Sequence, residues 1–259
     1  MITSRYKVES LAHGLEILSL FTIERPYLNL TEIAKATQLT KSKAFRLVST
    51  LEFLGYLEHN SDARCYRPSL KVLQLGFTAL NSMELAQIAQ PYLKSLSEKI
   101  GKTTNMAIRD GVDVIYVVRN AIPQITDINL QLGSRVPVYC TSMGKAQLID
   151  LSREELLDLL GEGPYLKQGP NTITSLEALE AELNQVRKNG YAINDEELAS
   201  GLYSVAAPIR NSHGKVIAAI NIAFVGGRLS RQELEVTLVP KIVDTAWKIS
   251  SAIGATYPR

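Results

Sequence analysis

The chain has 259 residues, of which 46% are hydrophobic and 21% charged, and its formal net charge is +2 at pH 7. This composition excludes a disordered or fibrous protein, and the length favours two domains. Residues 1–83 hold ten Lys/Arg against seven Asp/Glu, whereas the remainder is nearly balanced at 18 against 19. A nucleic-acid partner would therefore be bound through the placement of individual cations in the first part of the chain, and not through bulk charge.

Cysteine and histidine are too few and too scattered for a disulfide framework or a metal site. The N-terminal sequence MITSRYKVES lacks the apolar stretch of a signal peptide. The longest apolar run, residues 216–225, is interrupted by Asn221 and is too short to cross a bilayer. We therefore expect a cytoplasmic protein with no metal, no cofactor and no membrane contact.

The first predicted helix covers residues 10–22, with Ser10 as its N-cap. Leu11, Leu15 and Leu18 recur every three or four positions, which is the spacing of one helical face. We expect these leucines, together with Ile17 or Phe21, to point into the core of their own domain. The sequence Glu24-Arg25-Pro26 ends this helix.

Residues 30–54, LTEIAKATQLTKSKAFRLVSTLEFL, predict two short helices joined by a tight turn. Asn29 and Glu32 have the three-residue spacing of a capping box at the start of the first helix. Thr40 is the expected N-cap of the second helix. The buried face of the second helix is predicted to carry Ala44, Leu47, Val48, Leu51 and Leu54.

The opposite face of the second helix combines hydroxyl groups and cations near a helix N-terminus, where phosphate is favoured. This is how a helix-turn-helix recognition helix is built for the major groove. Two extended runs at residues 56–58 and 64–67 then predict a wing, whose cations would lie beside the duplex backbone. The expected DNA-binding residues are Thr40, Lys41, Ser42, Lys43, Arg46, Ser49, Arg64 and Arg67.

Residues 70–82 predict a helix with an apolar stripe of Leu70, Leu73, Phe77 and Leu80. Such a stripe either packs onto its own domain or pairs with a second copy of the chain. No Gly- or Pro-rich tether separates the two halves, so we expect a stiff connection. The predicted organisation is a winged helix-turn-helix domain at 1–69, a linker helix at 70–83 and a second domain at 84–259.

The second domain is predicted to mix hairpins and helices. Residues 85–100 form a helix that Pro91 should break or kink, unless Pro91 marks a new N1 position. Asp110-Gly111 predicts a hairpin turn, and three more strands are expected within residues 191–224. Residues 230–253 predict one long closing helix. Adjacent hairpins with helices grouped around them indicate an α+β fold with an antiparallel sheet.

No catalytic motif is present in the second domain: there is no nucleophile elbow and no glycine-rich phosphate loop. The cluster Asp195-Glu196-Glu197 follows a strand and is expected to be an exposed turn. Polar residues at positions that should be partly buried are more informative. Ser142, Asn194, Ser204 and Asn221 around an apolar floor, with a helix N-terminus nearby, predict a pocket for a small carboxylate.

The whole chain resembles the IclR family of bacterial transcription regulators. The resemblance rests on LTEIAKATQLTKSKAFRLVSTLEFLGYLE, LGSRVPVYCTSMGKA, GYAINDEELASGLYSVAAPI and GKVIAAINIAF, in the same order and nearly end to end. It implies a winged-helix domain, a linker helix and an effector domain of GAF-like or profilin-like fold. It also implies dimers that often pair into tetramers on palindromic operators. The segment NLQLGSRVPVYCTSMGKA looks most like regulators of aromatic-acid breakdown through protocatechuate and β-ketoadipate.

The resemblance also implies an effector pocket. Where members that bind small acids carry Asp, Cys and two Ser, this chain has Asn194, Ser204, Asn221 and Ala223, so an anionic ligand would meet no acidic group. In the recognition helix, Lys43 and Phe45 replace the commoner Thr and His or Tyr. Carried over by motif, the pocket residues are Ser142, Met143, Asn194, Leu202, Ser204, Asn221 and Ala223.

The expected function is therefore a transcription regulator that binds double-stranded operator DNA as a dimer or a dimer of dimers. Its effector would be a small organic acid, such as an aromatic acid. Two other classes of protein fit parts of the sequence. One is an enzyme acting on a small carboxylic acid, against which the missing catalytic residues argue. The other is an architectural DNA-binding protein without a ligand, which no small acid would stabilise against heat.

Overall fold

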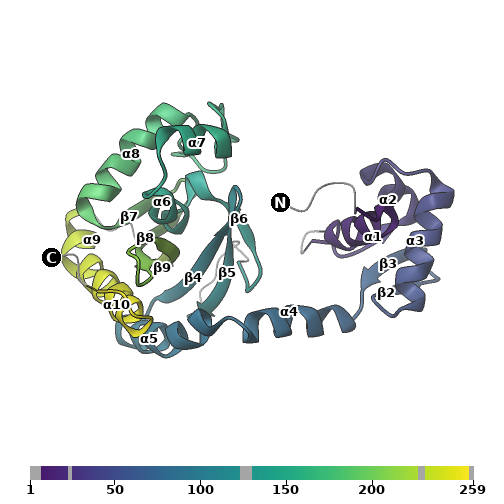
Figure 1. Ribbon diagram of the computed structural model, residues 1–259, viewed down its shortest axis with the longest axis horizontal. Helices are drawn as coiled ribbons and strands as arrows, with labels where there is room; N and C mark the ends of the chain where they lie inside the picture. Colours follow the sequence, from purple (N-terminus) through teal and green to yellow (C-terminus); the bar gives the residue numbers. More distant parts are fainter. Residues whose placement is uncertain (1–6, 23–24, 123–129, 227–230, 257–259) are drawn as a thin grey trace. The chain divides into compact units, whose positions relative to one another are not determined.

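The computed structural model describes residues 7–22, 25–122, 130–226 and 231–256, and the chain divides into two compact units, Met1–Ser82 and Met83–Arg259 (Figure 1). Glu24, expected within the stop of the first helix, and residue 230, the expected start of the closing helix, lie outside the described residues.

The N-terminal unit is a helix-turn-helix followed by a wing. Asn29 and Glu32 form the predicted capping box, and the Thr40 side chain accepts a hydrogen bond from the Lys43 amide. A small antiparallel sheet, in the order β1-β3-β2, forms the wing. The elements are α1 (Glu9–Ser19), β1 (Leu28–Asn29), α2 (Leu30–Ala36), α3 (Lys41–Phe53), β2 (Leu57–Asn60) and β3 (Cys65–Pro68).

The core of this unit is small and is centred on Ile17, Ile33 and Val48, one from each helix. The prediction for the first helix was wrong in part. Val8, and not Ser10, holds the N-cap position. Leu11 and Leu15 are 63% and 58% exposed, because Ile17 is the α1 residue that reaches the core. The apolar face of α1 is therefore largely uncovered in a single chain.

The helix α4 (Lys71–Asn81) continues from the wing and has no buried residue. Leu70, Leu73, Leu75 and Phe77 are all exposed on or beside it. Of the two roles considered for this stripe, packing onto its own domain is contradicted by this exposure. The stripe is free to meet another surface.

The C-terminal unit is built on a six-stranded antiparallel sheet in the order β6-β5-β4-β9-β8-β7, as the α+β prediction required. Helices α5 and α10 contact one another and cover one face, and α6, backed by α8, packs on the other (Figure 1). The strands are β4 (Thr103–Asp110), β5 (Asp113–Asn120), β6 (Arg135–Pro137), β7 (Ala192–Asp195), β8 (Leu202–Arg210) and β9 (Val216–Val225). The helices are α5 (Glu84–Ile100), α6 (Ser142–Leu148), α7 (Arg153–Leu160), α8 (Leu176–Asn189), α9 (Arg231–Thr237) and α10 (Val239–Ala252), with a 3₁₀ turn at Val138–Cys140.

Two expectations about the helices of this unit were wrong. Helix α5 begins at Glu84 and continues through Pro91, so Pro91 neither breaks the helix nor marks a new N1 position. The single closing helix is instead two helices, α9 and α10, separated at Leu238. Pro240 lies in the first turn of α10, where a missing N–H costs nothing but the preceding helix cannot continue.

Helix α6 is buried along its whole length and lies very close to the 3₁₀ turn before it. A Cβ atom on Gly144 would lie 2.1 Å from the Val138 carbonyl oxygen and 2.4 Å from the Val138 Cα. Both are backbone atoms, so neither can move aside as a flexible side chain would. Glycine at this position lets α6 approach closely enough to place its polar residues over the sheet.

The substitution Gly144→Ala should destabilise the C-terminal unit by about 2–3 kcal/mol, because α6 must move off the 3₁₀ turn. Urea denaturation followed by circular dichroism measures this loss. The matched control is Gly14→Ala in α1, where an added Cβ meets nothing within 4 Å. That variant should be neutral or stabilised by about 0.5–1 kcal/mol. Equal stabilities for the two variants would contradict the close packing.

Candidate effector and DNA-binding sites

The strand register of the C-terminal sheet brings polar residues into two adjacent rows. In one row, Arg119, Asn105 and Asn221 are paired across β5, β4 and β9. In the next row, Ala223, Ser204 and Asn194 are paired across β9, β8 and β7. Asn105 and Thr103 are two residues apart on β4, as are Asn221 and Ala223 on β9, and side chains two apart share a face. The rows therefore lie on one face, the face that α6 covers.

Hydrogen bonds join these residues to one another and to α6. Arg119 donates from its guanidinium to Asn105 Oδ1 at 2.9 Å, and Asn105 Nδ2 donates to Asn221 Oδ1 at 2.8 Å. The hydroxyl groups of Ser142, the first residue of α6, and Ser204 are 2.6 Å apart. Asn105, Ser142, Ser204 and Asn221 are all buried. They form two hydrogen-bonded groups in an otherwise apolar interior: the chain Arg119–Asn105–Asn221 and the pair Ser142–Ser204.

A cavity of about 80 Å³ lies over the two rows. Of the predicted effector residues, Asn194, Leu202, Ser204, Asn221 and Ala223 line it. Ser142 reaches it through its contact with Ser204. Met143 does not line this cavity and is fully buried in the main hydrophobic core. The helix N-terminus is capped by Thr141, whose hydroxyl accepts a hydrogen bond from the Gly144 amide and which also lines the cavity.

Sequence reasoning missed the other residues that line this cavity, among them Asn105, Tyr116 and Arg119. Arg119 is the most informative, because it is the one basic residue among the described lining residues. Burial lowers the pKa of the Arg119 guanidinium, since the charged form loses part of its hydration. A cation at the end of the apolar run VIYVV was a usable signal, but only strand pairing shows where its side chain lies.

The chemistry of the cavity is that of an anion site. One partly desolvated guanidinium, the amide side chains of Asn105, Asn194 and Asn221, and the hydroxyl groups of Thr103, Thr141, Ser204 and Tyr116 line it, and no carboxylate is among the described lining residues. A guanidinium gives charge-assisted hydrogen bonds to a carboxylate. Apolar and aromatic walls from Ile122, Leu130, Tyr116 and Phe224 would receive a carbon skeleton.

The predicted DNA-binding residues gather on one helix and on the wing. Lys41, Ser42, Lys43 and Arg46 are exposed on the first two turns of α3, and Ser49, one turn further, is partly buried. Thr40 itself is used as the helix cap. The outward side of α3 is thus free for a duplex.

The two wing arginines differ in their surroundings. Arg64 is exposed in the turn before β3, with a positive φ of 50°. Arg67 lies on β3 and pairs with Glu58 across the hairpin, with 2.7 Å between Arg67 Nη2 and Glu58 Oε2. The hydrogen bond to Glu58 raises the pKa of Arg67. Its charge is partly neutralised within the wing, so Arg64 is the freer of the two cations.

The prediction of an exposed turn at residues 195–197 was wrong. Glu197 is only 6% exposed, and its Oε1 accepts a hydrogen bond of 2.6 Å from Lys145 Nζ. The Lys145 ammonium is 1% exposed and also donates to Glu182 Oε1 at 3.0 Å. The physical reason is that a buried ammonium needs carboxylate partners, and only the fold brings α6, α8 and this turn together.

No group of histidine, cysteine and carboxylate side chains within the described residues could hold a metal ion. In the same part of the chain, no helix is both long enough and apolar enough to span a lipid bilayer.

A winged helix-turn-helix and a domain with a polar cavity, joined in one chain, are the parts of a ligand-responsive DNA-binding regulator. Residues 10–61 match the IclR helix-turn-helix domain, and residues 77–251 match the bacterial transcriptional regulator IclR C-terminal domain. The chain belongs to the IclR family of transcriptional regulators. It is therefore a regulator and not an enzyme, in line with its relatives below.

The chain is 37% identical to the Pca regulon regulatory protein of Pseudomonas putida, over 89% of this chain and 79% of that protein. It is 31% identical to the p-hydroxybenzoate hydroxylase transcriptional activator of Acinetobacter baylyi, over 95% of this chain and 92% of that protein. A solved structure of an IclR homolog from Microbacterium hydrocarbonoxydans, complexed with 4-hydroxybenzoate, superposes with a TM-score of 0.77 at 25% identity. That superposition covers 95% of this chain and all of the other.

Proposed function

We propose that this regulator responds to a small aromatic acid bound in the cavity beneath α6. The observation that carries the proposal is the half-buried guanidinium of Arg119, held by Asn105 in a cavity lined by no acidic side chain among the described residues. A cation that has lost hydration gains most from an anionic ligand. A regulator without a ligand would not need a charge in this place, so the architectural alternative is disfavoured.

The choice of an aromatic acid rests on the walls of the cavity and on the relatives. Tyr116 and Phe224 offer ring surfaces beside the polar rows. Two relatives carry names that refer to the pca regulon and to p-hydroxybenzoate hydroxylase, and one structural neighbour holds 4-hydroxybenzoate. In our proposal Ser142, Asn194, Ser204 and Asn221 orient the ligand, while Leu202 and Ala223 contact its carbon atoms. Met143 supports the site from the core.

We further propose that α3 binds in the major groove of the operator DNA. Lys43 and Arg46, one turn apart, would reach base edges or phosphates, with Lys41, Ser42 and Ser49 beside them and Thr40 ordering the helix N-terminus. Arg64 would contact the DNA backbone or the minor groove, and Arg67 would lie farther from the duplex. Binding to the chromosome places the protein in the cytoplasm.

We further propose that the protein acts as a dimer, or as a pair of dimers. Leu11, Leu15 and Leu18 of α1 line a groove of about 660 Å³ together with Leu75 and residues of α3. The groove and the stripe of α4 expose more large apolar side chains than a small monomeric domain normally leaves in water. A second copy would cover them, and residues 70–83 would link the dimeric part at 1–69 to the effector domain at 84–259.

For the groove assignment, Lys43→Ala and Arg46→Ala should each weaken binding by about 1–3 kcal/mol to a duplex selected from a random pool by the native protein. The slope of affinity against salt should also fall, because each variant removes one cation from the duplex. Fluorescence anisotropy at several salt concentrations measures both. Lys35→Ala, an exposed lysine on α2, is the control and should change neither. Native affinity in both α3 variants would refute the assignment.

For the effector site, Arg119→Gln should weaken binding of 4-hydroxybenzoate about ten-fold or more, because a hydrogen bond to a charged group is lost. The neutral analogue 4-hydroxybenzamide should bind weakly and should not distinguish the variant from the native protein. Isothermal titration calorimetry measures both ligands. The control is Arg109→Gln, on the neighbouring strand β4 but outside the cavity. If Arg119→Gln and Arg109→Gln bound 4-hydroxybenzoate with equal affinity, the assignment of Arg119 to an anion site would be refuted.

For the dimer, the double substitution Leu73→Asp with Phe77→Asp should give a monomer, because two charges would have to be buried in the interface. Analytical ultracentrifugation of the full chain measures the mass, and circular dichroism checks that the fold is kept. The control is Leu166→Asp, at an exposed leucine of the C-terminal unit. A native mass for the double variant would show that the α4 stripe is not the interface.

A further inference from the structure

The cavity beneath α6 contains a polar group that the proposed function leaves unused, the hydroxyl group of Tyr116. The Tyr116 side chain lines the cavity and is only 3% exposed, so its phenol lies inside the protein. Its hydroxyl group forms no hydrogen bond with any described residue. A buried hydroxyl group without a partner is unfavourable, so a ligand that supplies an acceptor would be stabilised there.

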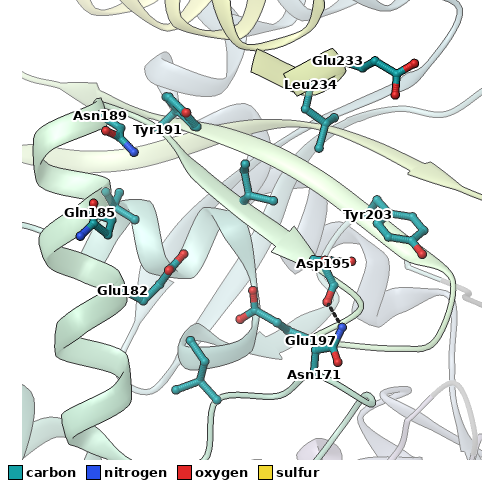
Figure 2. Close-up of a pocket in the computed structure, with 13 residues that line it drawn as sticks. Asn171, Glu182, Gln185, Asn189, Tyr191, Asp195, Glu197, Tyr203, Glu233 and Leu234 are labelled. Carbon is teal, nitrogen blue, oxygen red and sulfur yellow. Dashed lines mark hydrogen bonds between the residues drawn. The ribbon is translucent and has the colours of Figure 1, made fainter. Parts of the chain in front are cut away.

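Access to the cavity distinguishes this hydroxyl from another buried polar group of the same domain. Glu197 lines the pocket between α8 and α9 (Figure 2), and its Oε2 also has no hydrogen-bond donor among the described residues. That oxygen is sealed from solvent, so no ligand can reach it. The Tyr116 hydroxyl is not among the described polar atoms that are both unpartnered and sealed, and it borders a cavity. It can therefore contact a ligand.

A β-bulge places Tyr116 beside Arg119. The two residues are three apart on β5, a spacing that puts side chains on opposite faces of a regular strand. The register with β4 shifts between Met106 and Ala107, so that Arg119 pairs with Asn105 and Tyr116 pairs with Ala107. Asn105 and Ala107 are two apart on β4 and share a face. The bulge thus brings the phenol and the guanidinium to the same face, the one that α6 covers.

The charge states of the two groups suit a shared anionic ligand. Burial raises the pKa of the Tyr116 hydroxyl more than the nearby Arg119 charge lowers it. The phenol therefore stays protonated at neutral pH and is available as a hydrogen-bond donor. Burial lowers the pKa of Arg119, which has lost part of its hydration. A neutral donor next to a partly desolvated cation fits a group that has two acceptor atoms and a negative charge.

We propose that Tyr116 determines specificity in the effector site, by donating a hydrogen bond to the same ligand carboxylate that Arg119 binds. This inference rests on the proposed response to an aromatic acid and adds a second donor to that site. One carboxylate oxygen faces the guanidinium and the other faces the phenol. A site built to hydrogen-bond a ligand group rejects an analogue that lacks it, because the buried donors are then left unpaired.

The test is Tyr116→Phe in the full chain, which removes only the hydroxyl group. Isothermal titration calorimetry should show binding of 4-hydroxybenzoate about ten-fold weaker, because a hydrogen bond to a charged group is lost. Urea denaturation without ligand should show native or higher stability, since the hydroxyl has no partner among the described residues. A purely structural role would give the reverse, lower stability at native affinity, and would overturn the proposal.

The matched control is Tyr165→Phe. Tyr165 belongs to the same hydrophobic core as Tyr116 but does not line the cavity. Its hydroxyl donates a hydrogen bond of 2.9 Å to the carbonyl oxygen of Gly161. This variant should unfold at a lower urea concentration than the native chain, because that bond is lost. Its affinity for 4-hydroxybenzoate should be native.

The failure of this proposal can be told apart from the failure of the effector site itself. If Tyr116→Phe bound 4-hydroxybenzoate with native affinity while Arg119→Gln bound it weakly, the role of Tyr116 would be overturned and the anion site would stand. If the native chain bound no 4-hydroxybenzoate up to about 10 mM, the choice of an aromatic acid would be refuted, and the role of Tyr116 with it.

Discussion

The buried ammonium of Lys145 constrains the C-terminal domain more than any other group. A lysine with 1% of its side chain exposed must find carboxylates inside the protein, because its hydration is lost. Glu182 of α8 and Glu197 after β7 supply them, so three segments far apart in sequence are drawn to one point. The close contact of Gly144 with the 3₁₀ turn fixes how far α6 can move from that point. Helix α6 is therefore held at its first residue by the contact of Ser142 with Ser204 on the sheet, and at its middle by the contacts of Lys145 with Glu182 and Glu197.

This arrangement places two pockets on either side of one short segment. Asn194 lines the cavity that contains Arg119, and Glu197 lines the pocket between α8 and α9. The two residues are joined directly, because the Glu197 amide donates to Asn194 Oδ1 at 2.8 Å. A change in the position of this segment would therefore alter both pockets. A ligand can shift the segment only if it binds differently to the two positions of the segment.

The N-terminal unit is constrained by the small size of its hydrophobic core. Its core is too small to cover all the apolar residues of α1 and α4, and a small domain alone buries only a modest fraction of its surface. The uncovered leucines destabilise a monomer, because they are exposed to water, and they would stabilise an assembly that buries them. In the proposed dimer, the same surface that stabilises the unit would bring a second recognition helix to the DNA, which offsets its modest positive charge.

Local signals in the sequence determined the start of the two helices of the helix-turn-helix and the class of protein. The capping box at Asn29 and the Thr40 cap involve only residues within a few positions, so they can be recognised without a structure. The same holds for the recognition helix. It also holds for Asn194, Ser204 and Asn221, because polar residues within otherwise apolar strands can be recognised in the sequence. Tertiary structure alone decided that Leu11 and Leu15 stay exposed, that Glu197 is buried, and that Arg119 and Asn105 complete the cavity. Each of these depends on strand register or on packing between distant segments, where the free energy of a residue is set by neighbours that its own sequence does not specify.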